Sequence, residues 1–286
     1  MSRCWPAPAK LNLFLQVTGR RPDGYHTLQT VFQLLDFGDD IFLETTSDGM
    51  ISRPEGLAAV APEDDLVVRA ARRLQAVSGT TQGVEIRVRK RIPAGGGLGG
   101  GSSDAATVLV GLNQLWELGW PVERLAALGL ELGADVPVFI HGRSAWADGV
   151  GERLVPVTLP SACFAVICPD CFVSTAAVFA DPELTRDSAE TTIHGFLSSG
   201  GRNDCEPVVR RRYPAVAAAL DWLGARTAAR ARLTGTGSCV FAQFAELAEA
   251  REALAELPRE WTGFVARGLD ESPLLARAGR PVATVA

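Results

Sequence analysis

The sequence predicts an α+β protein in which two α/β halves pack together as two layers of sheet and helix. Alternating apolar patterns typical of strands recur between helical patterns along most of the chain, and no long linker or internal repeat separates them. A glycine-rich loop joins a strand to a helix near residue 100. With 286 residues, 47% of them apolar, the chain can bury a sizeable core. We expect an N-terminal domain over 1–153 and a C-terminal domain over 154–286.

The first half begins with a strand over residues 10–17, in which Lys10, Asn12 and Phe14 fall on one face and the intervening leucines on the other. Further strands are expected over 30–35, 40–45 and 84–88, and helices over 66–77, 103–118 and 122–132. A short helix is expected to begin at Asp135. Residues 47–63 are expected to form an exposed loop.

The second half follows a crossover segment over residues 142–163. Apolar patterns there predict strands over 164–168, 232–236, 239–244 and 263–268, alternating with helices over 206–225 and 245–257. This alternation is the reason for assigning a second α/β half.

The charge balance limits the partners that the protein can have. The net charge is −5 at pH 7 and the isoelectric point is near 5.4, which argues against a general nucleic-acid-binding protein. No apolar run reaches the roughly 18 residues of a transmembrane helix, and the first residues do not resemble a secretory signal. We therefore expect a cytoplasmic monomer or homodimer without membrane or nucleic-acid partners.

The six cysteines are scattered along a chain that is too long to need a disulfide framework. Cys168 and Cys171 form a C-x-x-C motif, but no second pair at zinc-binding spacing accompanies it. We interpret both as apolar cysteines that follow a strand. The three histidines show no metal-binding spacing either, so no metal-binding residue is predicted.

The glycine-rich loop is the strongest functional signal in the sequence. Residues 95–101 hold six glycines in seven positions, and two serines and an apolar helical pattern follow at once. Such a loop presents backbone N–H groups to an anion at the start of a helix, so we expect a nucleotide phosphate there. The residues expected to bind it are Pro93, Ala94, Gly95, Gly96, Gly97, Leu98, Gly99, Gly100, Gly101, Ser102 and Ser103.

Other glycine loops fit less well. The pattern Gly95-x-Gly97-x-x-Gly100 also occurs in dinucleotide-binding dehydrogenases, but here several elements precede the loop and no acidic residue ends a second strand after it. An ATPase P-loop needs Lys-Ser or Lys-Thr after the glycines, and this chain has neither there. For Ser102 and Ser103, capping of the helix stays open beside a contact with phosphate or magnesium.

With its neighbours, the loop resembles that of the GHMP kinase superfamily, which includes galactokinase, homoserine kinase and mevalonate kinase. Residues 233–239 are similar to the family's C-terminal glycine motif. One group within the family fits best, because it also matches blocks in the expected order at 8–13, 20–26, 132–139, 181–184 and 203–207. The resemblance implies a two-domain GHMP kinase fold, with the active site in the cleft between an N-terminal ATP-binding half and a C-terminal half.

The resemblance also implies the reaction. ATP would be the co-substrate, and its γ-phosphate would pass to a hydroxyl of a small molecule that carries a cytidyl diphosphate, on a non-mevalonate route to isoprenoid precursors. Mg²⁺ is expected to accompany phosphoryl transfer, with ligands that the sequence does not identify. The alternatives are a homoserine or mevalonate-type substrate, and a binding protein that has lost catalysis.

Catalytic roles carry over from the family to two residues. Asp135 would orient or deprotonate the substrate hydroxyl, and the ammonium of Lys10 would lie between that carboxylate and the hydroxyl. Without the resemblance, Asp135 would be read as a helix cap and Lys10 as a solvated strand residue. Asn12, on the same strand face as Lys10, would bind the same substrate group.

The resemblance assigns substrate recognition to a further set of residues. Tyr25 and His26, which follow a turn, would read the cytosine of the substrate, and Phe179 would cover the other face of the base. Thr175 would contact the substrate or Lys10.

Overall fold

The structure is a computed structural model that describes residues 3–54 and 64–279. Its strands are β1 (Arg3–Arg20), β2 (His26–Thr46), β3 (Ile51–Ser52), β4 (Gly83–Arg89), β5 (Ala145–Asp148), β6 (Arg153–Pro156), β7 (Cys163–Pro169), β8 (Arg232–Leu233), β9 (Val240–Phe244) and β10 (Trp261–Leu269). Its helices are α1 (Leu66–Ser78), α2 (Gly100–Leu115), α3 (Val122–Leu130), α4 (Val136–His141), α5 (Thr175–Phe179), α6 (Ile193–Ser199), α7 (Glu206–Arg212), α8 (Pro214–Gly224), α9 (Leu247–Ala253) and α10 (Pro273–Arg277). Within the expected loop 47–63, residues 55–63 lie outside the described residues.

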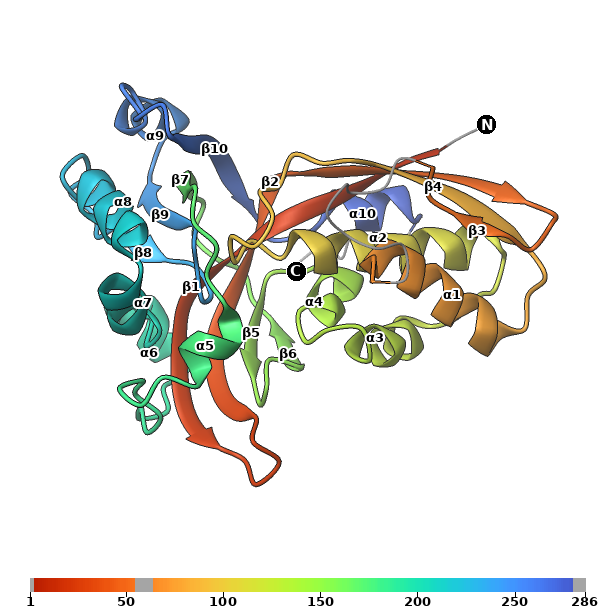
Figure 1. Ribbon diagram of the computed structural model, residues 1–286, viewed down its shortest axis with the longest axis horizontal. Coiled ribbons are helices and arrows are strands. Elements are labelled where there is room, and N and C mark those ends of the chain that lie inside the picture. The colour runs from red at the N-terminus through yellow and green to blue at the C-terminus, as the bar shows by residue number, and fades with distance from the viewer. Residues whose placement is uncertain (1–2, 55–63, 280–286) are drawn as a thin grey trace.

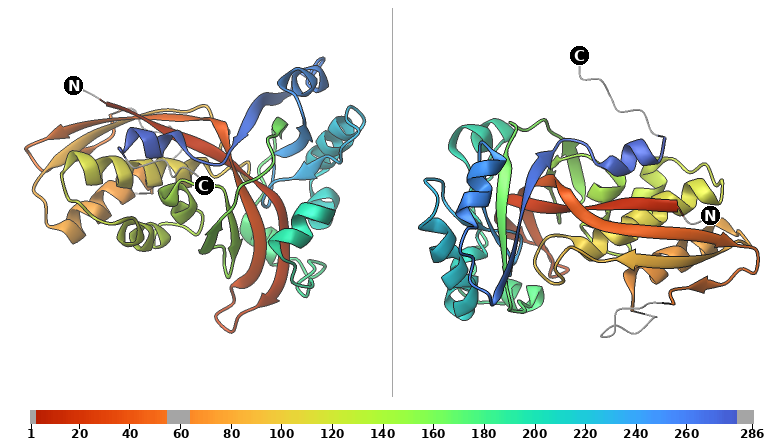
Figure 2. Two further views of the ribbon diagram at one scale, coloured as in Figure 1. Left: turned by 180° about the vertical axis from the view of Figure 1, so that it is seen from behind. Right: turned by 90° about the horizontal axis from the view of Figure 1, so that it is seen from above.

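A long antiparallel hairpin of β1 and β2 runs through both halves of the molecule (Figure 1). β2 also pairs with β4, β5 and β10, so strands from both halves join one sheet with the order β3-β4-β2-β10-β7-β9-β8. The helices α1 to α4 and α10 gather at one end of this hairpin and α5 to α9 at the other, as Figure 2 shows from behind. The predicted α+β class with two packed halves is confirmed.

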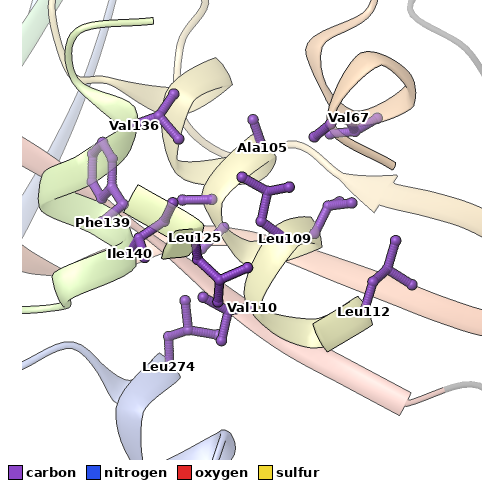
Figure 3. Packing of buried hydrophobic residues seen from close by; sticks show 14 of the residues in the cluster. Val67, Ala105, Leu109, Val110, Leu112, Leu125, Val136, Phe139, Ile140 and Leu274 are labelled. Atoms are coloured by element: carbon purple, nitrogen blue, oxygen red, sulfur yellow. The ribbon is translucent and has the colours of Figure 1, made fainter. Parts of the chain in front are cut away.

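Each half has a hydrophobic core of its own. In the first, α2 packs against α1, α3, α4 and the two hairpin strands (Figure 3). Leu274 of α10 belongs to this core, although it lies near the C-terminus. In the second core, α8 and α9 cover β7 and β9, and α7 packs against α8. A third cluster, which includes Leu11, Leu98 and Phe164, joins the two halves, and the boundary between 153 and 154 stays a prediction.

The strands depart from the sequence expectations where the pairing is irregular. The segments expected as two strands over 30–35 and 40–45 form the single strand β2. A register shift between Asn12 and Leu15 inserts an extra residue into β1, which breaks the alternation of faces. Phe14 therefore leaves the polar face and stacks on Phe196 at 4.9 Å between ring centroids.

The helices depart from the expectations at residues that change the backbone. The expected helix over 206–225 is two helices, because Pro214 lacks an N–H donor and starts α8. The helix expected over 103–118 begins at Gly100, three residues earlier, with Gly99 as its N-cap. Capping of this helix by Ser102 or Ser103 is therefore not what the structure shows.

One cysteine expectation is wrong. A disulfide joins Cys168, at the end of β7, to Cys239 in the C-terminal glycine motif, so Cys168 is not simply an apolar cysteine. Cys171 remains a free thiol. Among the helices of the described residues, none is long and apolar enough to cross a membrane.

Candidate active site

The glycine loop follows β4 and turns back against α4 and the C-terminal glycine motif. Gly97 has a φ of 76°, and a Cβ there would lie 2.4 Å from the carbonyl oxygen of Thr234. Gly99 has a φ of 73°, and a Cβ there would lie 2.7 Å from Cζ of Phe139. Both the positive φ and the close approach require glycine. The glycines therefore let the loop pack between the two halves while its backbone stays unshielded by side chains.

Hydrogen bonds connect this loop to β1 and to the C-terminal half. The Lys10 N–H donates to the carbonyl oxygen of Leu98 at 3.0 Å. Two residues along β1, the Asn12 N–H donates to the hydroxyl of Thr234 at 3.0 Å. The loop, the first strand and motif 233–239 thus meet at one point, which lies between the two halves of the fold.

Lys10 lies at this point and is 3% exposed. Its Nζ donates to Oδ1 of Asn12 at 2.5 Å and lies 3.2 Å from Oδ2 of Asp135, just before α4. Nδ2 of Asn12 in turn donates to the hydroxyl of Thr30 at 2.9 Å. Asn12 therefore holds the ammonium in place with one end of its amide. Lys10, Asn12 and Asp135 are brought together as the sequence predicts.

Asp135 faces the solvent more than its partners do. Its side chain is 36% exposed, while that of Lys10 is 3% exposed. Asp135 precedes α4 at the N-cap position, but its carboxylate makes no capping hydrogen bond. Because the carboxylate is not used by the helix, it remains available to a ligand beside Lys10.

The two serines after the glycines lie in different surroundings. Ser103 is fully buried, and its hydroxyl donates to the carbonyl oxygen of Pro8 at 2.7 Å, so that hydroxyl ties α2 to β1. Ser102 is partly exposed and lines the cavity beside the loop. The hydroxyl that is free to meet a ligand is therefore that of Ser102.

A cavity of about 560 Å³ opens on the outer side of the glycine loop. Besides the loop itself, its lining includes Arg53, Asp65, Lys90 and Asp104. Such a cavity offers backbone N–H groups to an anion at the start of α2, whereas its two positive side chains are paired, Arg53 with Asp65 and Lys90 with Asp104. Sequence reasoning identified the loop but missed these four residues.

Lys90 bridges two buried carboxylates beside this cavity. Its Nζ contacts Oδ2 of Asp104 at 2.7 Å and Oδ2 of Asp39 at 2.5 Å. Burial raises the pKa of Asp104 to about 7, although the charge of Lys90 opposes the shift. Burial alone would lower the pKa of Lys90, but the two carboxylates outweigh it and the pKa is raised. One sequence signal could have identified this residue, because Lys10 and Lys90 are the only two lysines of the chain.

A second group of predicted residues meets at the far end of the hairpin. His26 begins β2, and its ring stacks on that of Phe179, at the end of α5, with 5.1 Å between centroids and 26° between planes. Nε of Arg186, which the sequence did not single out, donates to Nε2 of His26 at 3.1 Å. Tyr25 lies at the tip of the hairpin with its side chain 67% exposed. The structure thus pairs His26 with Phe179 and leaves Tyr25 open to solvent.

Thr175 lies at the start of α5 and faces the C-terminal glycine motif. Its hydroxyl shares a hydrogen bond of 2.8 Å with that of Thr236. This places it beside the motif rather than beside the stacked rings. Among the described residues, no three or more His, Cys, Asp or Glu side chains form a group that could hold a metal ion.

Comparison with known proteins agrees with this geometry. Residues 65–143 match the model of the GHMP kinases N terminal domain, and residues 188–263 match that of the GHMP kinases C terminal. The chain is 58% identical over 282 residues to 4-diphosphocytidyl-2-C-methyl-D-erythritol kinase of Halorhodospira halophila, which covers 96% of this chain and 97% of that protein. It is 55% identical over 269 residues to the enzyme of that name from Pseudomonas aeruginosa, with 94% of this chain and 95% of that protein covered.

Solved structures give the same result for the fold. A crystal structure of 4-(cytidine 5'-diphospho)-2C-methyl-D-erythritol kinase superposes with a TM-score of 0.82 at 34% identity, over 94% of this chain and 99% of that one. Homoserine kinase from Cytophaga hutchinsonii superposes with a TM-score of 0.70 at 17% identity, over 95% of each chain, and shows a shared fold only.

Proposed function

The chain belongs to the GHMP kinases and, within them, to the 4-diphosphocytidyl-2-C-methyl-D-erythritol kinases, and from this membership we propose the reaction that it catalyses. It transfers the γ-phosphate of ATP to the 2-hydroxyl of 4-diphosphocytidyl-2-C-methyl-D-erythritol and yields the 2-phosphate and ADP. This step belongs to the non-mevalonate pathway of isoprenoid precursors. The observation that carries the proposal is the similarity to these kinases over nearly the whole chain, at up to 58% identity.

The stacked pair of His26 and Phe179 supports a substrate with a base. The ring of Phe179 provides a flat face on which cytosine can stack, and the imidazole of His26 beside it would hydrogen-bond the edge of the base. Tyr25, which is exposed next to them, is free to pack against the base when it binds. Homoserine and mevalonate derivatives have no ring for such a surface.

The distance between the two groups of residues also favours a long substrate. On β1, Arg20 pairs with His26, while Lys10 pairs with Leu34. Eight residues of β2 therefore separate His26 from the strand position opposite Lys10, at most about 27 Å along the strand. A base joined through a diphosphate to a polyol can reach from one group toward the other. Homoserine is too short to do so.

In the proposed mechanism, Lys10 and Asp135 act on the substrate hydroxyl. The carboxylate of Asp135 orients the hydroxyl for in-line attack and takes up its proton as the bond to phosphorus forms. The ammonium of Lys10 stabilises the charge that develops on the hydroxyl oxygen. Asn12 positions that ammonium through its side-chain oxygen. Its amide is already used by Lys10 and Thr30, so its role is to support Lys10.

ATP occupies the cavity beside the glycine loop in this proposal. The N–H groups of residues 94–102, at the start of α2 and before it, hold the phosphates, and the hydroxyl of Ser102 adds a contact. Lys90 lies at the edge of the same cavity, bound to Asp39 and Asp104. Thr175 acts indirectly through its bond to Thr236, since that bond supports the C-terminal glycine motif.

The residues present fit a Mg²⁺ ion that binds mainly to the phosphates of ATP. Mg²⁺ usually keeps several waters and takes one or two protein oxygens beside phosphate oxygens, so it does not need a cage of carboxylates. Ser102, at the start of α2, has a partly exposed hydroxyl that would supply such an oxygen. When bound, the ion neutralises charge on the transferred phosphoryl group.

A coupled assay of ADP release tests the proposed function. With the cytidyl substrate, we expect turnover that depends on ATP, and none above background with homoserine or phosphomevalonate. Turnover with either of these two and not with the cytidyl substrate would refute the assignment. We also propose that the enzyme works in the cytoplasm as a monomer or homodimer, which light scattering on the purified protein would distinguish.

A further inference from the structure

Arg186 touches the one side chain that the proposed function assigns to reading the edge of the base. Its Nε lies 3.1 Å from Nε2 of His26, and an arginine side chain can only donate hydrogen bonds. Nε2 of His26 must therefore be the acceptor and carries no proton. In a neutral imidazole, the proton is then on Nδ1, and His26 offers a ligand a donor at that atom.

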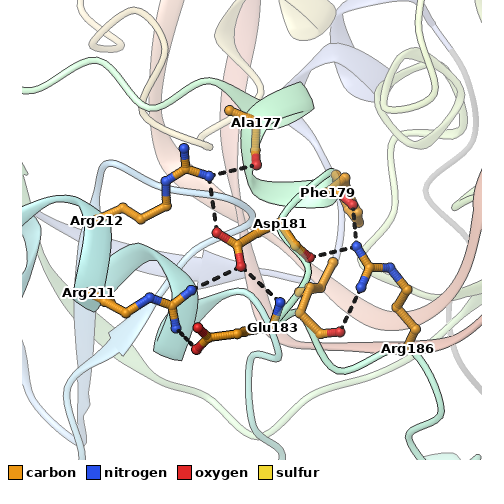
Figure 4. Close-up of polar contacts among 8 residues, drawn as sticks. Ala177, Phe179, Asp181, Glu183, Arg186, Arg211 and Arg212 are labelled. Carbon is orange, nitrogen blue, oxygen red and sulfur yellow. Dashed lines mark hydrogen bonds and ion pairs between the residues drawn. The ribbon is translucent and has the colours of Figure 1, made fainter.

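The guanidinium of Arg186 is held in this orientation by backbone oxygens (Figure 4). Its Nη1 donates to the carbonyl of Leu184 at 3.0 Å. Its Nη2 donates to the carbonyls of Phe179 at 2.9 Å and Asp181 at 2.7 Å. Four of the five N–H groups of the side chain are thereby used. Because three of these bonds are to the backbone, the fork cannot rotate to release His26 without losing them.

The segment that carries Arg186 is anchored in its turn to α7. Asp181 accepts from Nη2 of Arg211 at 2.9 Å and from Nη1 of Arg212 at 3.0 Å, as Figure 4 shows. Neither of these arginines contacts His26. Bonds from α7 therefore hold the segment 181–186 in place, and Arg186 of this segment contacts His26 at the start of β2. Replacing Arg212 removes one of these bonds without removing a contact to His26, so it serves as a matched control.

Cytosine and uracil differ in hydrogen-bonding character at the base edge that His26 would contact. N3 of cytosine is an acceptor, whereas N3 of uracil carries a hydrogen and is a donor. A donor at Nδ1 of His26 pairs with the first and opposes the second. We propose that Arg186 is a positioning residue that fixes His26 as the Nδ1–H tautomer and thereby selects cytosine over uracil in the substrate. The substrate named in this proposal rests on the proposed function, whereas the tautomer of His26 does not depend on it.

The electrostatic surroundings of His26 agree with a neutral ring. Partial burial lowers the pKa of His26, and the positive charges of Arg186 and Arg20 lower it further. A doubly protonated ring would place an N–H on Nε2 against the N–H of Arg186, so the same contact excludes that form.

The first test observes the ring without any substrate. Nitrogen-15 NMR of the imidazoles distinguishes a protonated from an unprotonated ring nitrogen, and the chain has only three histidines to assign, with His26→Gln identifying the signal of interest. At pH 7.5 we expect Nε2 of His26 unprotonated and Nδ1 protonated in the wild type. In Arg186→Met we expect a mixture of tautomers. In Arg212→Met we expect the wild-type pattern. A protonated Nε2 in the wild type would overturn the inference.

The second test measures the choice of base. kcat/KM is compared for 4-diphosphocytidyl-2-C-methyl-D-erythritol and its uridyl analogue. In Arg186→Met we expect the preference for cytosine to fall by about tenfold or more, mainly through KM. Arg212→Met should keep the wild-type preference. An equal loss of activity on both substrates in Arg186→Met, with the preference intact, would show a merely structural role and would overturn the assignment.

The two tests separate this inference from the proposed function. If the wild type does not turn over the cytidyl substrate, the proposed function fails, while the NMR result still decides the state of His26. If it does turn over that substrate and accepts the uridyl analogue equally well, the function stands and the role of Arg186 in selection fails. Circular dichroism and melting curves of both variants exclude unfolding as the cause.

Discussion

Lys10→Met removes the ammonium at the centre of the candidate site while keeping an unbranched side chain of similar length. Lys10 is 3% exposed, so methionine fills the same space between β1 and the glycine loop. The change therefore isolates the charge and its hydrogen bonds. In the proposed mechanism this charge acts on the oxygen of the substrate hydroxyl, where negative charge develops during phosphoryl transfer.

The structure gives the size of the expected effect. At 3.2 Å from Asp135, the ammonium has a gross attraction of about 5 kcal/mol at an effective dielectric constant of about 20. Water offsets part of it, because the carboxylate is 36% exposed. A preorganised donor that acts on a developing oxyanion contributes about 10²- to 10³-fold in kcat, and we expect a loss of that size. The oxygen of Asn12 loses its partner as well, which costs about 1–3 kcal/mol of stability.

The assay is steady-state ADP release at saturating ATP, with the melting temperature measured in parallel. We expect kcat to fall by about 10²- to 10³-fold and the melting temperature by several degrees. Lys10→Arg keeps the charge but brings a wider fork into a site shaped for an ammonium, so it should recover only part of kcat. A folded Lys10→Met variant whose kcat stays within tenfold of the wild type would refute the role given to this residue.

Further outcomes follow for the residues around Lys10. Asp135→Ala should abolish turnover yet keep the affinity for ATP measured by calorimetry, because ATP binds at the glycine loop; retained turnover would remove the proposed acceptor of the proton. Gly97→Ala should destabilise the protein by about 1 kcal/mol or more, since the added Cβ meets the carbonyl of Thr234; an unchanged melting temperature would contradict this. The pKa of Asp104 is about 7 in the folded protein, above its ordinary value of 3.8, so the folded state binds the extra proton between these pH values. Binding of this proton therefore stabilises the folded protein fully below pH 4, and the stabilisation is lost as pH rises through 7. The free energy of unfolding from urea titrations should show this pH dependence in the wild type and not in Asp104→Asn. Acylation of lysines at alkaline pH, read by mass spectrometry, should label Lys90 slowly, because its raised pKa keeps the amine protonated, and ATP should slow the labelling further; equal rates with and without ATP would place the nucleotide elsewhere.

The sequence predicted those features of the site whose positions follow from a local pattern of residues. Strand alternation placed Lys10 and Asn12 on one face, and the hydrogen bond between their side chains confirms it. Asp135 was expected at the start of a short helix and lies there. The glycine run predicted an unshielded loop before a helix, and the loop joins β4 to α2 as expected.

Other features depend on contacts between distant parts of the chain, which patterns do not encode. The extra residue between Asn12 and Leu15 arises from pairing with β2, so alternation alone put Phe14 on the wrong face. Ser103 looked like a phosphate ligand, but β1 passes close enough for its hydroxyl to bond Pro8. The sequence places Cys168 in a C-x-x-C motif with Cys171, but the fold brings Cys168 to Cys239, which is 71 residues away, and the two form a disulfide.

The lysine content shows that composition carried one further signal. Of 28 lysines and arginines, only Lys10 and Lys90 are lysines, and the structure puts both beside the glycine loop. Arginine supplies every other basic side chain, including those that brace the segment around Asp181. A compact ammonium can approach two oxygens from different elements at once, as Lys10 does with Asn12 and Asp135, whereas a planar fork prefers two oxygens in its own plane. In a chain that otherwise uses arginine, a lysine therefore marks a position where a point charge is needed.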